Sequence, residues 1–314
     1  MTRNADFSTF SSRLHLKGNL VFQTGMRIGA EGSNAVDQPD LPVLRDALGR
    51  PYIPGSSFKG AFRSSLEAIL RTLQEHPNVQ DRNLACLSVG KPGKRAQDDP
   101  QPALCLTQDE VKQIKQARPD EWGRQVSGPL RDRLNSLDLS GLGSDDACRD
   151  HALYSLSCRT CRLFGSPWSA SKVLIRDMPL QDADSWPVNI RDGVAIDRDA
   201  GRAADKMKYQ FEALAPGAAF DFEMLIENAS EADLGLLWMA IAAFERGEVP
   251  MGGARSRGLG WCALTLDWGS SKWVGAENLL DFLFTPDYHQ DATVLSDKPA
   301  EWLASFQREI MRPA

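Results

Sequence analysis

The sequence predicts an α+β protein, in which an antiparallel sheet is flanked by helices and carries large insertions. Apolar residues alternate along 13–22, recur every three or four residues along 57–73, and repeat both periodicities over 220–226 and 231–246. A period of two is typical of a half-buried strand, and a period near 3.6 is typical of an amphipathic helix. The length of 314 residues indicates about two domains, or one domain with insertions.

The first strand is predicted over 13–22 and the first helix from Ser57 to about Leu73. Ser56 or Ser57 can cap this helix, because a serine side chain accepts a hydrogen bond from the first turn. Its apolar stripe consists of Phe58, Phe62, Leu66, Ile69 and Leu73. The opposite stripe, which we expect to face solvent, consists of Lys59, Arg63, Glu67 and Arg71.

Residues 76–150 read as an insertion, because they contain many prolines and charges and few periodic apolar runs. We expect short helices over roughly 107–117 and 129–138 and no separate apolar core. The polar segment 191–212 is predicted to be a long exposed hairpin or loop. The remaining sequence completes a sandwich of the ferredoxin or RRM type. It is predicted to contain a strand over 220–226, a helix over 231–246, a glycine-rich loop and a strand over 259–267.

The charge balance does not decide the class of ligand. The chain has 36 basic and 42 acidic residues, a net charge of −6, which by itself argues against a nucleic-acid-binding protein. Residues 276–314 hold seven of the acidic and three of the basic side chains, a net of −4, so most of the excess lies in one segment. No apolar run approaches the ~20 residues of a membrane span, and no apolar signal region opens the chain, so we expect a cytoplasmic protein with no membrane partner.

Two segments have the composition of a phosphate-binding site. The loop MGGARSRGLGW, residues 251–261, places arginines among glycines, and the start of the first helix offers hydroxyls and cations. Each segment alone is equally typical of a tight turn or a solvated helix end. Together they indicate a phosphate-rich ligand, held by Ser56, Ser57, Lys59, Arg63, Gly252, Gly253, Arg255, Ser256, Arg257 and Gly258.

The cysteines predict a structural metal site. Cys158 and Cys161 form a CxxC pair, and Cys86 and Cys105 lie upstream in the insertion. A reducing compartment favours metal binding or core packing over disulfides, and a Zn²⁺ ion would stabilise a proline-rich insertion. Cys148 or His151 could replace one of these ligands, and a thioredoxin-like redox pair is the rival interpretation. Cys262 lies on the apolar face of its strand and is expected in the core.

Three motifs in this order resemble the RAMP-superfamily backbone subunit of type III CRISPR–Cas effector complexes: LRDALGRPYIPGSSFKGAFRS, CRTCRLFGSPWSASKV and GGARSRGLGW. The resemblance implies an RRM-like palm in 1–75 and 166–268, a zinc-binding insertion in 76–165 and a β-hairpin thumb at about 190–212. Residues 269–314 would form an acidic C-terminal extension. In the thumb, Met207, Tyr209 and Phe211 could wedge between bases.

The resemblance also implies an activity. Subunits of this family stack as a filament on the CRISPR RNA, beside further copies and related subunits, and can cut complementary target RNA. The cleavage aspartate of the family corresponds to Asp40, with Asp37 as a near neighbour, although both are also ordinary turn residues. Such a carboxylate binds Mg²⁺ or Mn²⁺ or positions the RNA 2′-hydroxyl.

Two alternatives remain open from the sequence. The subunit could be a non-catalytic scaffold on the same RNA. It could also be a guide-processing endoribonuclease that works by general acid–base catalysis, for which His15 is the only plausible histidine.

Overall fold

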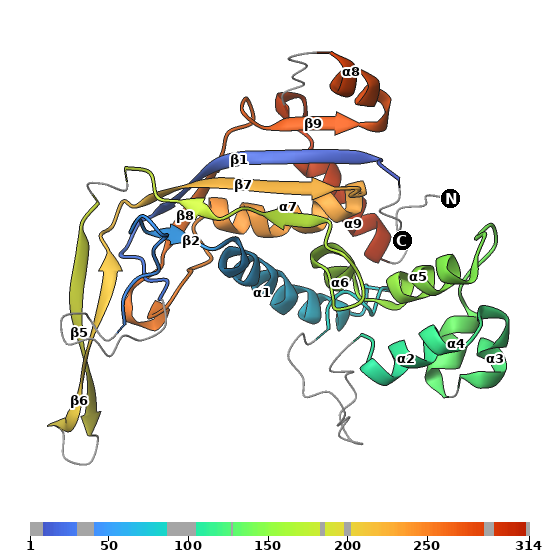
Figure 1. The fold of residues 1–314 in the computed structure, drawn as a ribbon, viewed down its shortest axis with the longest axis horizontal. Helices are drawn as coiled ribbons and strands as arrows, with labels where there is room; N and C mark the ends of the chain where they lie inside the picture. The colour runs from blue at the N-terminus through green and yellow to red at the C-terminus, as the bar shows by residue number, and fades with distance from the viewer. Residues whose placement is uncertain are drawn as a thin grey trace.

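The computed structural model describes residues 9–29, 41–86, 105–126, 128–182, 186–197, 202–285 and 292–311. Its centre is an antiparallel sheet in the order β3-β7-β1-β8. Strand β9 also pairs with β1, along its first four residues, whereas β8 pairs with its last five. Helices cover one face of this sheet (Figure 1), which confirms the predicted α+β class. The five strands are β1 (Ser12–Phe22), β3 (Val173–Ile175), β7 (Ala219–Glu227), β8 (Cys262–Leu266) and β9 (Lys272–Gly275).

Strand β1 is the half-buried strand that its alternation predicts. Leu14, Leu16, Leu20 and Phe22 are at most 1% exposed and face the helices. On the opposite face, His15 contacts Glu223 of β7 with its Nε2 atom 3.2 Å from the carboxylate Oε2. The sheet is therefore apolar on the helix side and lined by polar pairs on the other side.

Two helices pack directly against the sheet, α1 (Gly55–Gln74) and α7 (Glu231–Glu245). Aromatic rings join them, since Phe58 lies 4.9 Å from Phe244 and 5.4 Å from Phe222 between ring centroids. Each fully buried phenylalanine contributes about 2–3 kcal/mol of hydrophobic stabilisation. Ser230 and Asp233 form a capping box that fixes the start of α7.

Helix α1 differs from the prediction in which residues it exposes. Ile69 is 43% exposed, and Leu70 is buried in its place, so the apolar stripe advances in steps of four from Phe58. The basic stripe does not face solvent as expected, because the side chain of Glu67 is only 6% exposed and that of Arg63 only 20%. The reason is tertiary: this side of α1 packs against α6 (Arg159–Phe164) of the insertion.

The insertion contains short helices and has an apolar core of its own. Helices α2 (Gln108–Gln116) and α4 (Pro129–Asn135) match the predicted ranges, whereas the absence of a core was predicted wrongly. The residues of that core include Leu106, Val111, Ile114, Trp122, Leu130, Leu134, Ala152 and Leu153. The remaining insertion helices are α3 (Trp122–Gln125) and α5 (Asp145–Leu156).

A long hairpin leaves the opposite end of the molecule from the insertion (Figure 1). It consists of β5 (Val188–Asp197) and β6 (Arg202–Leu214), which pair from Val188–Leu214 to Asp197–Arg202. The hairpin predicted at 191–212 is therefore present and slightly longer. A short pair, β2 (Tyr52–Ile53) with β4 (Met178–Pro179), joins the segment before α1 to the chain that leads into the hairpin.

The C-terminal segment is part of the fold. Helix α9 (Pro299–Ile310) packs along α7 through the buried side chains of Trp302 and Phe306. Gly235 of α7 makes this close contact possible, because a Cβ atom there would lie 2.1 Å from the carbonyl oxygen of Trp302. A small helix, α8 (Leu279–Phe284), follows β9. Within the described residues, no helix is both long and apolar enough to cross a membrane.

Candidate functional site

Three adjoining pockets form one groove beside the glycine-rich loop, which we call the arginine groove. The first, of about 500 Å³, lies between Gly60 and Ser64 of α1 and the loop residues Pro250 to Gly252. The second, of about 570 Å³, shares Gly252 and Arg255 with the first. The third, of about 400 Å³, shares Ala254 and Ser256 with the second and is also lined by Arg27, Leu41, Tyr209, Phe211 and Arg257. The groove therefore connects α1 to the base of the hairpin.

The glycines of the loop permit close packing against the chain that follows β1. Gly252 has a φ of +84°, and a Cβ atom there would lie 2.4 Å from the carbonyl oxygen of Arg27. Gly253 donates its N–H to that same oxygen at 2.7 Å, so this N–H serves the fold and is not available to a phosphate. What the loop presents to solvent is the side chains of Arg255, Ser256 and Arg257.

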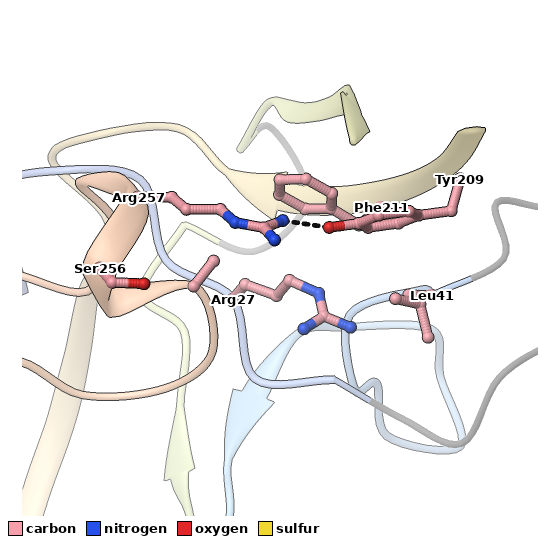
Figure 2. Close-up of a pocket in the computed structure, with 7 residues that line it drawn as sticks. Arg27, Leu41, Tyr209, Phe211, Ser256 and Arg257 are labelled. Carbon is pink, nitrogen blue, oxygen red and sulfur yellow. Dashed lines mark hydrogen bonds between the residues drawn. The ribbon is translucent and has the colours of Figure 1, made fainter. Parts of the chain in front are cut away.

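Two arginine–aromatic pairs line the hairpin end of the groove (Figure 2). The Arg257 guanidinium donates a hydrogen bond to the Tyr209 hydroxyl and lies 5.9 Å from the centroid of its ring. The Arg27 guanidinium lies 5.7 Å from the centroid of Phe211 and points toward Leu41. Gly193 of β5 makes room for Tyr209, since a Cβ atom at that position would lie 2.2 Å from the tyrosine ring.

The groove is positively charged. Within the described residues, no carboxylate forms an ion pair with Arg27, Arg255 or Arg257. The Nε atom of Arg27 is buried and has no hydrogen-bond partner there. Arg27 was not predicted from the sequence, because it stands alone in an irregular segment and only the fold brings it to the loop. Among the described residues that line the groove, the acidic one is Glu248, and it is paired with Arg246.

Helix α1 contributes less to the groove than the sequence predicted. Ser56 and Ser57 are exposed at its start, but neither lines the three pockets. Lys59 donates to the Ser171 hydroxyl at 2.8 Å and to the Val173 carbonyl at 2.9 Å, and burial, followed by the charge of Arg63, lowers its pKa. Arg63 points toward the cysteines. The expectation that Lys59 and Arg63 face solvent is therefore wrong.

The predicted cleavage residues Asp37 and Asp40 lie outside the described residues. The chain is described again from Leu41, which follows Asp40 in the sequence and lines the groove. Leu41 is bound to β6 by two backbone hydrogen bonds, from its N–H to Gln210 at 3.2 Å and from the Glu212 N–H to its carbonyl at 3.1 Å. The chain immediately after the 30–40 segment, at Leu41, is therefore fixed at the hairpin end of the arginine groove.

The four predicted cysteine ligands come together in one buried cluster. The Sγ atoms of Cys86, Cys105, Cys158 and Cys161 all lie within 4.8 Å of one another, and those of Cys86 and Cys161 are 3.6 Å apart. Sulfurs at the corners of a tetrahedron around zinc, with Zn–S bonds of about 2.3 Å, would be about 3.8 Å apart. The donor set and its spacing therefore fit a tetrahedral metal ion.

The surroundings of the cluster favour the thiolate form of Cys158. The neighbouring thiol of Cys105, followed by those of Cys161 and Cys86, lowers the pKa of the Cys158 thiol by hydrogen bonding to its thiolate. The alternative ligands lie elsewhere: Cys148 packs against the core of the insertion, and the His151 Nε2 atom contacts the Ser155 hydroxyl at 3.2 Å.

The two remaining candidates are separate from both sites. Cys262 is fully buried, as predicted for a core residue, and burial raises its pKa to about 12. His15 lies on the polar face of the sheet against Glu223, and none of the residues that line the arginine groove is a histidine. These positions give the groove no described imidazole for acid–base catalysis.

The sequence is similar to one described family and to two curated proteins. The sequence model of the RAMP superfamily matches residues 19–263. The CRISPR system Cms endoribonuclease Csm3 of Methanocaldococcus jannaschii is 43% identical over 60 residues, which is 19% of this chain and 24% of the relative. The protein of the same name from Methanothermobacter thermautotrophicus is 42% identical over 60 residues, 18% of this chain and 24% of the relative. The chain thus spans about a quarter of the length of the curated relatives that it matches.

Proposed function

This chain belongs to the RAMP superfamily, and from that membership we propose that it is a guide-RNA-holding backbone subunit of a type III CRISPR effector complex that cleaves bound target RNA. The two relatives named as Csm3 endoribonucleases support this proposal, although each is matched over a quarter of its length. The observation that carries the proposal is the arginine groove, which places three arginines, none of them ion-paired to a described carboxylate, and two aromatic rings along one path.

The fold supplies a platform suited to single-stranded RNA. The order β3-β7-β1-β8, with α1 and α7 as the connecting helices, supports the assignment of this sheet as an RRM-like palm. The hairpin β5–β6 would be the thumb, the segment 76–165 a zinc-bearing insertion, and 269–314 an extension that completes the core. Further copies or related subunits would continue the same RNA path as a filament.

The groove offers both kinds of contact that RNA requires. Arg255 and Arg257, beside Ser256, would bind guide phosphates with paired N–H donors, and Arg27 would add a third cation. Tyr209 and Phe211 present ring surfaces on which an unstacked base can pack. Ser56 and Ser57, at the exposed start of α1, would extend the phosphate contacts along the helix.

We place the cleavage chemistry in the 30–40 segment. Asp40, or Asp37 as its neighbour, would position the target 2′-hydroxyl for in-line attack on the adjacent phosphorus. The hydroxyl would lose its proton, the bond from phosphorus to the 5′-oxygen of the next nucleotide would break, and the products would be a 2′,3′-cyclic phosphate and a 5′-hydroxyl end. A bound Mg²⁺ or Mn²⁺ would stabilise the developing negative charge. The position of Leu41 in the arginine groove supports this proposal, because Leu41 directly follows Asp40 in the sequence and lines the proposed RNA path.

The deciding experiment measures cleavage of labelled complementary RNA by the guide-loaded complex, with Mg²⁺ or Mn²⁺, for wild type, Asp40→Ala and Asp37→Ala. We expect Asp40→Ala to abolish cleavage and to leave target binding within about twofold. Asp132→Ala, a matched control on an insertion helix where the side chain is 77% exposed, should cleave at the wild-type rate.

Two outcomes would correct the proposal. Loss of cleavage in Asp37→Ala alone would move the site by three residues within the same segment. No cleavage by the wild-type complex, with RNA still bound, would make the chain a non-catalytic scaffold and would refute its assignment as a nuclease.

A further inference from the structure

Three arginines surround the four-cysteine cluster. Arg63 donates from Nη2 to the Sγ atom of Cys161 at 3.4 Å. Arg71 donates to the carbonyl of Cys86 at 3.3 Å, and Arg133 donates to the carbonyl of Cys105 at 3.1 Å. Arg63 and Arg71 both come from α1 and Arg133 from α4. The cluster therefore lies between two arginines of α1 and one arginine of the insertion helix α4.

The Arg63 guanidinium has a fixed orientation. Its Nε atom donates to Glu67 Oε1 at 2.6 Å, and its Nη1 atom donates to the carbonyl of Gly165 at 3.1 Å. Although burial disfavours its charge, the hydrogen bond to Glu67 and the charges of Cys161 and Glu67 raise its pKa. All three nitrogens thus have acceptors within the protein. An RNA phosphate would have to displace a buried partner to reach this side chain.

A metal-bound cysteine cluster requires such a partner. Four thiolates around one divalent ion carry roughly two excess negative charges, and burying uncompensated charge is costly. A cation with an N–H···S hydrogen bond offsets part of that charge and holds the ligand sulfur in place. Groups that hydrogen-bond to metal ligands typically change metal affinity by about 10- to 100-fold.

We propose that Arg63 is a positioning residue of a zinc site formed by Cys86, Cys105, Cys158 and Cys161, and that it couples the occupancy of this site to helix α1. The inference rests on the zinc assignment within the proposed function and replaces the predicted role of Arg63 in RNA binding.

The coupling follows from the two sides of α1. Gly60 and Ser64 line the arginine groove, and Arg63, between them in sequence, faces Cys161. Glu67 then links Arg63 to Arg71, since its two carboxylate oxygens lie 2.6 Å and 3.8 Å from those arginines. Loss of the metal would remove the negative charge of the metal-bound thiolates, which the network of Arg63, Glu67 and Arg71 balances. These three residues belong to α1, the helix that forms one wall of the arginine groove.

The test compares the full-length wild type with Arg63→Met, Arg63→Lys and the matched control Lys59→Met, which lies one turn earlier and does not touch the cysteines. Zinc affinity is measured by competition with a chromogenic chelator. The thiolate-to-metal charge-transfer band is recorded after substitution with Co²⁺. We expect Arg63→Met to weaken zinc binding by about 10- to 100-fold and to shift the cobalt band.

The control and the conservative variant make the result specific. Lys59→Met should leave zinc affinity and the cobalt band unchanged. Arg63→Lys should fall between wild type and Arg63→Met, because one ammonium group cannot donate to Glu67, Gly165 and Cys161 with the fixed geometry of a guanidinium. This variant keeps the charge, so it can be measured even if Arg63→Met does not fold.

RNA binding separates the possible failures. With zinc kept saturating, Arg63→Met should bind guide RNA within about threefold of wild type, and chelation of wild type should weaken RNA binding. Unchanged zinc affinity and an unchanged cobalt band, together with a large loss of RNA affinity, would overturn the proposal and make Arg63 an RNA ligand. A wild-type chain that binds RNA but no zinc would refute the zinc assignment and leave the RNA assignment standing.

Discussion

At the scale of single residues, the same residue type has two different surroundings in this protein. Arg63 has its charge paired and its donors used inside the fold, whereas the exposed Arg257 side chain contacts the Tyr209 ring and hydroxyl and pairs with no described carboxylate. The sequence shows both as arginines beside small residues and cannot separate them. Burial and partners decide which arginine is available to a ligand.

The first prediction concerns the arginines of the groove. Arg257→Gln and Arg27→Gln each remove one cation from the proposed RNA path and one stacking partner of an aromatic ring. Each should weaken guide-RNA binding and reduce the magnitude of the slope of log affinity against log salt concentration by about 0.7, the contribution of one phosphate contact with a single strand. Fluorescence titration at several salt concentrations measures both quantities. Arg50→Gln is the control, since Arg50 is paired with Asp46 outside the groove. An unchanged slope in both groove variants would remove these arginines from the RNA path.

At the scale of elements, periodic segments were predicted well and insertions less well. The alternation of 13–22 predicted β1 correctly, because this strand buries one face. The apolar residues of 231–246 predicted α7 correctly, because this helix buries nearly its whole surface. Helix α5 was missed, since its polar run Asp145–Asp150 shows little periodicity. It is held by contacts with the core of the insertion, which a local pattern does not report. Ile69 was assigned to the buried side of α1, yet a step of four places Leu70 there.

A second prediction concerns α9, the helix that covers α7. Trp302 is 5% exposed and packs on Trp238 at 6.1 Å between ring centroids. Trp302→Ala should lower the free energy of unfolding by about 3–5 kcal/mol, because it leaves a large cavity between the two helices. Leu303→Ala, on the next residue at 37% exposure, should cost less than about 1 kcal/mol. Urea denaturation measures both values. Equal small losses would show that α9 adds little to the fold.

At the scale of the whole molecule, overall charge and local charge have opposite signs. The net charge is −6, yet the described lining of the arginine groove contains three arginines and one carboxylate, which is already paired. Residues 276–314 hold much of the acidic excess, and none of their described members lines the groove. The average charge of the chain therefore does not describe the surface that a phosphate chain would meet.

The corresponding prediction is a strong dependence of RNA binding on salt. Three phosphate contacts per subunit give a slope of about −2 for log affinity against log salt concentration, since each contact with a single strand contributes about −0.7. Measuring the affinity of the assembled complex for guide RNA between low and physiological salt tests this value. A flat response would argue against phosphate binding in the groove.

The position of α9 has a consequence for the order in which the protein is made. Helix α7 is apolar on nearly all sides, and the side that α9 covers is completed only after synthesis has passed residue 310. A ribosome that stops between 276 and 298 would hold a nascent chain that contains all five strands of the sheet, while the side of α7 that α9 covers stays bare. Such a chain exposes the kind of surface that promotes aggregation and chaperone binding. The burial of α7 is therefore incomplete until α9 has been made.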